Sequence, residues 1–335
     1  MAALRVLSVG LGATLQDGGR HGYLRYGITA AGPMDPLAHA TANAALGNAT
    51  NATAIEVSLG GIEVTAEGAV LTVAVAGGAF AVSLDGQALC PNVVLSLEPG
   101  AKLRIRPGSA GAWCYLAIAG EFAVAPVLGS TATHVRSGLG GLDGRTLRAE
   151  DLFSVRSRPS IKLPPSRIAA PWLDRPCDAI RIVLGPQDDY FAAEALAAFL
   201  STDWSVSPRN DRMAMFLDGP RVRHASGHDI VSDGIVMGAI QVPGDGRPIV
   251  LMADRQPTGG YPKIATVIGP DLGRLAQARA GSRFRFVQVS RDQAVAARVA
   301  EAAHLRTPPP REPLVRTSFP SEFLLGLNLI DGVHG

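Results

Sequence analysis

Short strand-like segments follow one another at close spacing through the first half of this chain. Each segment is rich in Val, Leu, Ile and Thr, and each is bounded by Gly, Pro, Asp or Asn. Turn dipeptides such as Asp85-Gly86 and Pro99-Gly100 separate some of them. Strands at such close spacing predict an all-β barrel or sandwich. The segments are residues 4–9, 55–57, 61–65, 69–76, 79–84, 93–97, 102–106 and 112–118.

One helix is expected to interrupt these strands. Asp35 is a good N-cap, and Pro36 suits the first helical turn. The Ala-rich run of residues 37–45 follows and ends before Gly47. This order of residues predicts a single short helix within the first group of strands.

A proline-rich segment, residues 157–176, is typical of a linker. It predicts one domain over residues 1–160, a second over residues 177–305, and a C-terminal connector with a closing strand over residues 306–335. In the second half we expect strands at residues 179–184, 213–217, 238–242, 249–253, 264–268 and 283–289, helices at residues 190–200 (capped by Asp188 or Asp189), 271–279 and 291–305, and the closing strand at residues 323–330.

The composition indicates a globular protein of the cytoplasm. The 335 residues are 47% hydrophobic and 18% charged, and the net charge of +2 is too small to favour nucleic acid or an anionic membrane as a partner. The three cysteines show no C-x-x-C spacing and the N-terminus has no secretory signal, so we expect free thiols in a reducing compartment. His224 and His228 are spaced like helical metal ligands, but Gly227 between them disfavours the helix, so we expect no metal site.

The segment from Asp254 to Lys263 holds more polar chemistry than a structural loop needs. It joins two strand-like runs, residues 248–253 and 264–268, and contains a carboxylate, a guanidinium, an amide, a hydroxyl, a phenol and an amine. Sites tend to be built on loops that a rigid sheet positions, so we expect a site here; the alternative is a tight turn with solvated charges. The residues assigned to it are Asp254, Arg255, Gln256, Thr258, Gly259, Gly260, Tyr261 and Lys263.

Two further groups of residues are candidates for other walls of the site. Asp17 could act as a general base or orient a donor, and Arg20 could clamp a carboxylate or phosphate; the alternative is an internal salt bridge between the two. Asp211, Arg212 and Gln241 form the other group, in which Arg212 could present its guanidinium to an anionic substrate or form a structural ion pair. Asp35 is also a candidate, although its position before a helix favours the N-cap role over contact with a substrate.

Several motifs occur together along the chain. They are residues 16–22 (QDGGRHG), 32–35 (GPMD), 128–130 (LGS), 210–213 (NDRM), 238–243 (GAIQVP), 254–263 (DRQPTGGYPK) and 328–333 (NLIDGV). Their combination resembles the family that comprises allophanate hydrolase subunit 2, the C subunit of 5-oxoprolinase and the corresponding half of the carboxyltransferase domain of urea carboxylase. The resemblance implies a mainly β fold of two cyclophilin-like β-barrel domains with a few short helices.

The resemblance also implies a partner and a substrate class. Members of the family work with a smaller partner, of the type of allophanate hydrolase subunit 1 or the B subunit of 5-oxoprolinase, so we expect a separate partner polypeptide and a heterotetramer. They act on small amides, ureas or lactams through ATP or carboxybiotin. Three positions depart from the family pattern: Glu121 and Ala214 stand where many relatives carry glycine, and Asp233 stands where they carry glutamate.

The chemistry of this family builds negative charge on a substrate oxygen, which needs preorganised donors. Candidate cations are Lys263 and Arg255, candidate side-chain donors are Tyr261 and Gln256, and the backbone amides of Gly259 and Gly260 could form an anion nest. The segment lacks the glycine spacing and the Lys-Ser/Thr pair of a P-loop. We expect catalytic roles for Lys263, Asp17, Arg20, Tyr261 and Gln256, and contacts with substrate or nucleotide for Arg212, Gln241, Asp254, Arg255, Thr258, Gly259, Gly260 and Asp35.

The first hypothesis for function is a subunit of an ATP-dependent 5-oxoprolinase. The complex would open the lactam 5-oxoproline to glutamate and would use ATP, with or without Mg²⁺. This hypothesis is favoured because the sequence contains neither a biotin carrier motif nor a carboxylase domain. One alternative is a carboxyltransferase that receives carboxybiotin and acts on urea-like substrates. The other is a non-enzymatic regulator that binds its partner.

Overall fold

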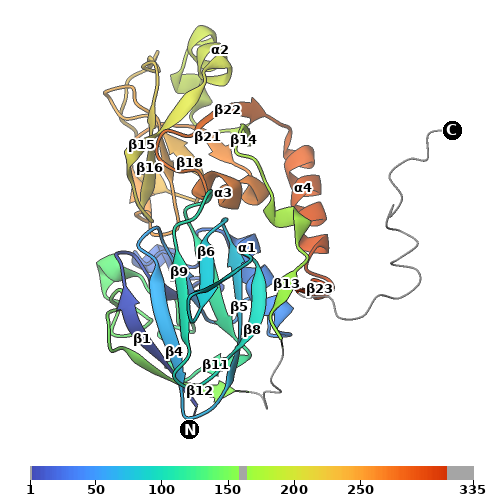
Figure 1. Cartoon of the computed structure of the whole chain (residues 1–335). Coiled ribbons are helices and arrows are strands. Elements are labelled where there is room, and N and C mark those ends of the chain that lie inside the picture. Colours follow the sequence, from blue (N-terminus) through green and yellow to red (C-terminus); the bar gives the residue numbers. More distant parts are fainter. Residues whose placement is uncertain (1, 158–163, 315–335) are drawn as a thin grey trace, which may run out of the picture.

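The computed structural model describes residues 2–157 and 164–314, which form two β-rich units that lie one above the other (Figure 1). The strands of the first unit are β1 (Ala3–Val9), β2 (Thr14–Gln16), β3 (Ala54–Val57), β4 (Ile62–Glu67), β5 (Leu71–Gly77), β6 (Ala81–Leu84), β7 (Gln87–Leu89), β8 (Val93–Leu97), β9 (Lys102–Arg106), β10 (Cys114–Ile118), β11 (Gly120–Phe122), β12 (Leu152–Ser157), β13 (Ser166–Ile168) and β23 (Arg311–Pro313). The strands of the second unit are β14 (Ala179–Leu184), β15 (Trp204–Asn210), β16 (Ala214–Asp218), β17 (Asp233–Gly234), β18 (Ala239–Gln241), β19 (Ile249–Leu251), β20 (Thr258–Gly259), β21 (Lys263–Val267) and β22 (Arg283–Gln288). The helices are α1 (Pro36–Ala45), α2 (Ala193–Ser201), α3 (Gly269–Ala276) and α4 (Arg291–Ala303).

Two seven-stranded sheets build the first unit, in the orders β11-β12-β1-β4-β9-β6-β7 and β2-β3-β10-β5-β8-β13-β23. The alternation of polar and apolar residues decides which face each strand buries. In β9, for example, Leu103 and Ile105 are buried, whereas the flanking Lys102, Arg104 and Arg106 are exposed. The buried side chains of the two sheets join in one hydrophobic core.

The second unit is a closed barrel with the strand order β14-β21-β18-β19-β16-β15-β22. Closure pairs β14 with β22 in parallel, while the other neighbours are antiparallel. Aromatic residues fill part of its core: the ring of Phe199 from α2 stacks on Phe286 at a centroid distance of 4.9 Å, and Trp204 is fully buried beside them. This packed core makes the barrel rigid, and the barrel includes β18, β19 and β21.

Asp35 caps α1 and also joins the two units. Its Oδ1 accepts a hydrogen bond from the backbone N–H of Ala38 at 3.2 Å, which confirms the predicted N-cap. Its Oδ2 accepts from Nη2 of Arg175 at 2.6 Å and from Nε2 of Gln277, just after α3, at 2.9 Å. Because Asp35 is fully buried, these bonds fix α1 of the first unit against α3 of the second.

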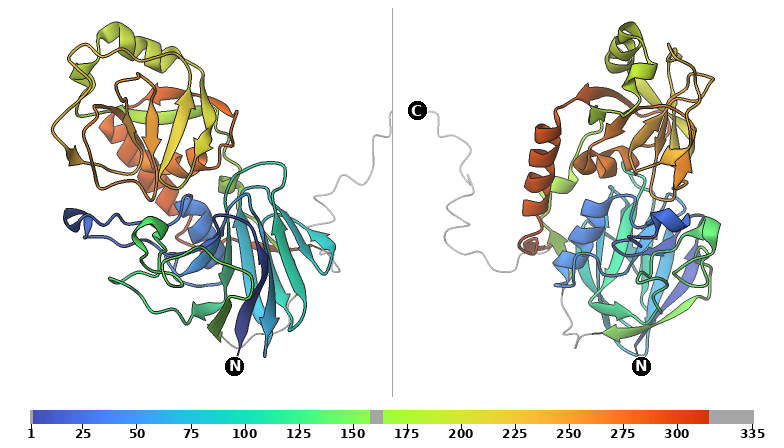
Figure 2. Two further views of the ribbon diagram at one scale, coloured as in Figure 1. Left: turned by 90° about the vertical axis from the view of Figure 1, so that its left-hand side faces the viewer. Right: turned by 180° about the vertical axis from the view of Figure 1, so that it is seen from behind.

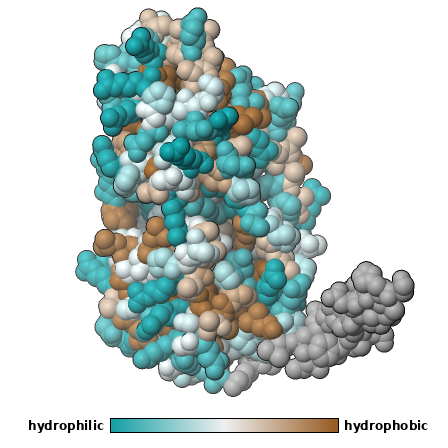
Figure 3. Space-filling view, turned by 45° about the horizontal axis from the view of Figure 1, so that its top comes forward, coloured by the Kyte–Doolittle hydropathy of each residue, from teal (hydrophilic) through white to brown (hydrophobic). Residues whose placement is uncertain are grey.

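Loops of the first unit reach out on one side of the molecule. In the left view of Figure 2, residues 21–28 (dark blue) and 124–145 (green) extend beyond the sheets. Several large apolar side chains are exposed there, including Tyr26 at 64% and Val135 at 44%. On the face shown in Figure 3, most of the visible surface is hydrophilic or neutral, and the apolar residues form small separate patches.

The predicted mainly β fold with a few short helices is confirmed. The predicted linker contains β13, which pairs with β8 and β23, so this segment adds to a sheet of the first unit. The domain boundaries themselves stay a prediction, and the closing strand expected at residues 323–330 lies outside the described residues. No helix within residues 2–157 and 164–314 is long and apolar enough to cross a membrane.

Helix α2 and strand β15 of the second unit differ from the prediction, and the two-residue strands β17 and β20 were not predicted either. Helix α2 begins at Ala193, because Phe191 is extended, buries its ring and pairs its backbone with His224. Asp188 and Asp189 instead lie in a short 3-10 turn. Strand β15 was not predicted, since its outer half is polar and contains a proline; the register there shifts, and buried positions in its first half hold it in the barrel.

Candidate functional site

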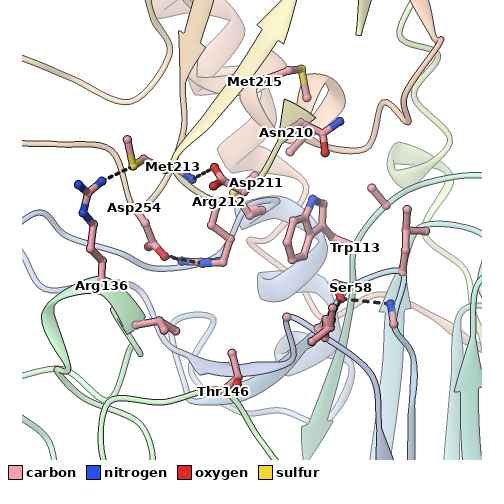
Figure 4. Close-up of a pocket in the computed structure, with 18 of the residues that line it drawn as sticks. Ser58, Trp113, Arg136, Thr146, Asn210, Asp211, Arg212, Met213, Met215 and Asp254 are labelled. Carbon is pink, nitrogen blue, oxygen red and sulfur yellow. Dashed lines mark hydrogen bonds and ion pairs between the residues drawn. The ribbon is translucent and has the colours of Figure 1, made fainter. Parts of the chain in front are cut away.

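A cavity of about 800 Å³ lies between the two units. This volume is within the range of about 300–1,000 Å³ that is usual for small-molecule sites. Side chains from both units point into it (Figure 4). Its polar lining residues are Ser58, Arg136, Thr146, Asn210, Asp211, Arg212 and Asp254, and its large apolar lining residues are Leu11, Met34, Leu59, Trp113, Val135, Met213 and Met215.

Arg212 forms the charged floor of the cavity. Its guanidinium donates to both carboxylate oxygens of Asp254, at 2.9 Å from Nε and 2.7 Å from Nη2. Nη1 pairs with Glu56 of the first unit, and Nη2 also donates to the carbonyl of Gly32 at 2.8 Å. Burial by itself would lower the pKa of Arg212, but the charges of Glu56 and Asp254 outweigh burial and raise it. The guanidinium is therefore permanently charged. It binds Asp254 of the second unit in a bidentate manner and also bonds to Glu56 and the Gly32 carbonyl of the first unit.

Glu56 is the deepest member of this network. It is fully buried, and its Oε2 accepts from the backbone N–H of Met34 at 2.7 Å and from the hydroxyl of Tyr115 at 2.8 Å. Burial raises the pKa of Glu56, against the charge of Arg212 and these hydrogen bonds, which lower it. Since its oxygens are occupied inside the protein, Glu56 can orient Arg212 but does not face a ligand.

The rim of the cavity carries charged groups from both units. Arg136 is exposed and its Nη1 contacts the sulfur of Met213 at 2.7 Å; among the described residues no carboxylate forms an ion pair with it. Two residues before Met213, Oδ1 of Asp211 accepts from the backbone N–H groups of Met213 at 2.7 Å and Ala214 at 2.9 Å, which fixes this carboxylate. Trp113 supplies an apolar wall beside Arg212 (Figure 4). The arrangement suits a small molecule with a charged end and an apolar body.

The predicted loop between β19 and β21 is present, but its two ends have different surroundings. Asp254 lines the cavity. Arg255 instead donates from Nε to the carbonyl of Ile235 at 3.1 Å and from Nη1 to the carbonyl of Met252 at 3.4 Å. Burial lowers the pKa of Arg255, against the charge of Asp254, which raises it. The guanidinium of Arg255 is thus used to hold backbone segments together.

Lys263 lies at the other end of this loop, under residues 230–235, which contain β17 and which we call the flap. Its side chain is only 5% exposed, and Nζ lies 3.0 Å from Oδ2 of Asp233 on the flap. Gln241 stands opposite Lys263 in the register of β18 and β21 and is 2% exposed. Its Nε2 is 3.5 Å from the carbonyl of Tyr261, the long limit of a hydrogen bond.

The glycines of the loop bring the flap close to the barrel. Strand β20 pairs with β17, and the carbonyl of Gly260 accepts from the N–H of Ile230 at 2.8 Å. A Cβ atom on Gly259 would lie 2.6 Å from Nε2 of Gln241 and 2.6 Å from Cδ1 of Ile235. Only a glycine permits this approach.

The remaining candidates of the loop lie outside the cavity lining. Thr258 is exposed in β20, and Tyr261 is 41% exposed. Gln256 is partly buried, and its Oε1 is buried without a hydrogen-bond partner among the described residues. The catalytic roles predicted for Tyr261 and Gln256 stay predictions.

Asp17 and Arg20 both bind the same neighbouring loop of the first unit. Asp17 accepts from the hydroxyl of Ser130 at 2.6 Å and from the N–H of Thr131 at 2.7 Å. Arg20 is 1% exposed and donates to the carbonyls of Val127 at 2.8 Å and Ser130 at 3.2 Å. In the described structure no salt bridge joins the two residues. They therefore shape the loop that leads to the cavity rim, and their predicted roles in catalysis stay predictions.

The structure brings the predicted residues together in two places: Arg212 with Asp254 at the cavity, and Lys263 with Gln241 under the flap. Sequence reasoning missed Glu56, Trp113 and Arg136. Glu56 carried a usable signal, because it is a lone carboxylate between apolar residues of a strand and needs a cation when buried. Trp113 and Arg136 reach the cavity only through the tertiary arrangement, so their local sequence gave no sign of it.

The chain is similar to known proteins in both sequence and fold. Residues 26–288 match the family described as carboxyltransferase domain, subdomain A and B. The chain is 36% identical over 299 residues to the C subunit of 5-oxoprolinase from Escherichia coli strain K12, a match that covers 88% of this chain and 94% of that protein. It is 30% identical over 315 residues to urea amidolyase of Lachancea kluyveri, a match that covers 86% of this chain but 17% of that protein. The crystal structure of the K. lactis urea amidolyase superposes with a TM-score of 0.83 at 26% identity, over 91% of this chain and 20% of that chain.

Proposed function

Because the chain belongs to the family of the carboxyltransferase domain, subdomain A and B, we propose that it is part of an enzyme complex that opens the lactam 5-oxoproline to glutamate with ATP. The observation that carries this proposal is the extent of one similarity. The match covers 94% of the C subunit of the E. coli 5-oxoprolinase, but 17% of the Lachancea urea amidolyase. The similarity therefore extends over nearly the whole of that oxoprolinase subunit.

The cavity between the units is the proposed substrate site. 5-Oxoproline has a carboxylate and an apolar ring edge. Arg136 has no ion-pair partner among the described residues and can bind the carboxylate, while Trp113 can cover the ring. Asn210 and the fixed Asp211 can hydrogen-bond the lactam group. Arg212 does not need to touch the substrate, because its role is to fix the floor.

ATP does not fit this cavity on the residues of this chain alone. A triphosphate needs several cationic or amide donors. Of the two arginines in the lining, Arg212 is already bonded to two carboxylates, which leaves Arg136. We therefore place the nucleotide of the complex at a site to which other polypeptides of the complex contribute.

A partner would also explain apolar residues at the cavity mouth. Leu11 is 91% exposed, Val135 is 44% exposed and Leu59 is 43% exposed, and all three line the cavity. A smaller polypeptide of the type of the 5-oxoprolinase B subunit would cover them, and two such pairs would form a heterotetramer. Replacing Leu11 with serine should weaken complex formation, as measured by light scattering on a sizing column.

Reconstitution tests the proposal. The chain is mixed with its smaller partner and the third subunit from the same source, and glutamate and ADP are measured with 5-oxoproline and ATP as substrates. We expect turnover that requires all components, and an increase in KM for 5-oxoproline of about ten- to a hundredfold for Arg136→Gln, the range for a lost hydrogen bond to a charged group. Arg291→Gln, on the exposed start of α4, is the matched control and should leave KM unchanged.

The second candidate is carboxyl transfer from carboxybiotin to a urea-like substrate. It is favoured by the TM-score of 0.83 with a urea amidolyase structure. Absence of oxoprolinase turnover, together with urea-dependent loss of carboxyl groups from a biotinylated protein, would replace the first proposal with this one. A stable complex in which neither reaction occurs, and which changes the activity of its partner, would instead indicate the regulator.

A further inference from the structure

The pairing of Lys263 differs from that of Arg212 and Arg175. Arg212 is held by Glu56, whose side chain is 0% exposed, and Arg175 by Asp35, whose side chain is 1% exposed. The side chain of Lys263 is 5% exposed, but that of its acid partner Asp233 is 56% exposed. A buried ammonium is therefore neutralised from the solvent side, by a residue of the flap.

The flap is anchored at both ends, and the side chains between these ends are exposed to solvent. The N–H of Ile230 donates to the carbonyl of Gly260 at 2.8 Å, and the N–H of Ile235 donates to the carbonyl of Pro257 at 3.0 Å. Ile235 is fully buried and belongs to a small apolar cluster, whereas the residues from Val231 to Gly234 are exposed. The short strand β17 pairs only with the short strand β20 in the described structure. Asp233 can thus leave Lys263 while Ile235 stays anchored.

A second donor lies beside Lys263. Gln241 faces it across the β18–β21 pair, so both side chains lie on the same face of the barrel. The amide nitrogen of Gln241 has one long contact, at 3.5 Å, to the carbonyl of Tyr261. An ammonium and an adjacent amide donor match the two oxygens of a carboxylate.

We propose that Lys263 and Gln241 form a binding site for a small carboxylate, and that the carboxylate of Asp233 occupies this site in the free chain. A buried ammonium without a counter-charge is costly, so Asp233 can be released only when another anion replaces it. The ligand and the flap therefore compete for one cation. This site is separate from the cavity between the units and does not depend on the proposed function, under which both substrate and product carry such a carboxylate.

Because Asp233 and the ligand compete for Lys263, Asp233→Asn should change the affinity for a carboxylate in one direction only. The apparent dissociation constant of a ligand is its intrinsic constant divided by the fraction of molecules in which the site is free. Removing the charge of Asp233 increases that fraction, so the variant should bind a carboxylate more tightly. Because Asp233 is more than half exposed and its pairing is screened by solvent, we expect a gain of up to about fivefold. If the pair were only structural, the substitution would give no such gain.

The test is a titration of the ¹⁵N-labelled full chain with sodium acetate, against sodium chloride at equal ionic strength. The readouts are the backbone amide signals of Ile230 and Ile235 and the side-chain amide of Gln241. We expect saturable shifts in the wild type, tighter binding in Asp233→Asn, and no binding in Lys263→Gln. Asp229→Asn is the matched control, since this residue is 70% exposed and pairs with His228 rather than with Lys263.

Three outcomes would overturn the proposal: no saturable shift at these residues in any form, binding that is unchanged or weaker in Asp233→Asn, or inorganic phosphate binding there in preference to acetate. Because Asp233 is exposed, its variant should fold, and the conclusion does not depend on Lys263→Gln. The readout is binding at named residues of the chain alone. Failure of this proposal is thus distinguishable from failure of the oxoprolinase assay.

Discussion

Replacing Arg212 with methionine tests whether the buried network holds the two units together. Methionine keeps an unbranched apolar stem but removes the charge and the bonds to Asp254, Glu56 and the Gly32 carbonyl. Glu56, at 0% exposure, and Asp254, at 8%, then lose their shared cation. Removing one partner of a buried ion pair costs about 3–5 kcal/mol, because the other charge stays buried.

The expected loss can be measured by calorimetry. A cost of about 3–5 kcal/mol, at about 2–4 °C per kcal/mol for a folded unit of about 150–250 residues, lowers Tm by about 6–20 °C. Arg285→Met is the matched control, since Arg285 pairs with Asp203 on the surface at side-chain exposures of 58% and 52%. An exposed pair contributes little to stability, so the control should shift Tm by about 4 °C at most.

The pH dependence of the Arg212→Met variant gives a second check. Burial raises the folded-state pKa of Glu56 above its ordinary value of 4.5, and the variant lacks the charge of Arg212 that opposes this. A raised folded-state pKa gives a contribution to stability that is complete below about pH 4.5 and is lost as pH rises through the folded-state value. The destabilisation relative to the wild type should therefore shrink as pH falls toward 4.5. A Tm loss no larger than that of the control, or one that grows in acid, would refute this account of the network.

Three further variants test other parts of the fold. His39 is buried, and burial lowers its pKa from 6.5 to about 4. Its contribution to stability is therefore complete above pH 6.5 and is lost as pH falls to 4. His39→Gln should remove about 3 kcal/mol of this acid sensitivity, measured as urea midpoints at several pH values. Gly259→Ala should cost about 1–3 kcal/mol and speed amide exchange in the flap, because its Cβ would lie 2.6 Å from Gln241, whereas Gly234→Ala meets nothing within 4 Å and should be nearly neutral. Asp35→Asn and Asp35→Ala both remove the charge between the units, but only asparagine can still cap α1. Asp35→Ala should therefore be less stable than Asp35→Asn by about 1 kcal/mol, and equal urea midpoints would contradict the capping role.

The sequence allowed the fold to be predicted where local and tertiary preferences agree. The alternation in β9 and the cap of α1 each depend on a few consecutive residues, so both elements can be predicted from the local sequence. The start of α2 was missed because Phe191 leaves the helical conformation to reach the barrel core, which no local pattern shows. Strand β15 was missed because its outer half is polar, and its pairing depends on neighbours far away in the sequence.

The candidate site was predictable only in part, for a related reason. The density of polar groups around Asp254 and Lys263 correctly pointed to a loop between two strands. It could not show that Asp254 lies at a cavity and Lys263 under a flap, because the partners that decide this, Glu56 and Asp233, come from other segments. The role of a charged residue is set by its counter-charge, and counter-charges are a tertiary property.

The cavity and the flap are connected through two adjacent residues. Asp254 binds Arg212 at the cavity floor, and Arg255, next in the chain, donates to the carbonyl of Ile235 at the end of the flap. Movement of the flap that releases Asp233 but keeps Ile235 anchored therefore acts on Asp254 and Arg255, the same short segment that positions Arg212. Asp233 reaches Lys263 with a short side chain, so the flap must lie close to the barrel for the 3.0 Å contact. Gly259, which has no side chain to block that approach, is the residue that permits it.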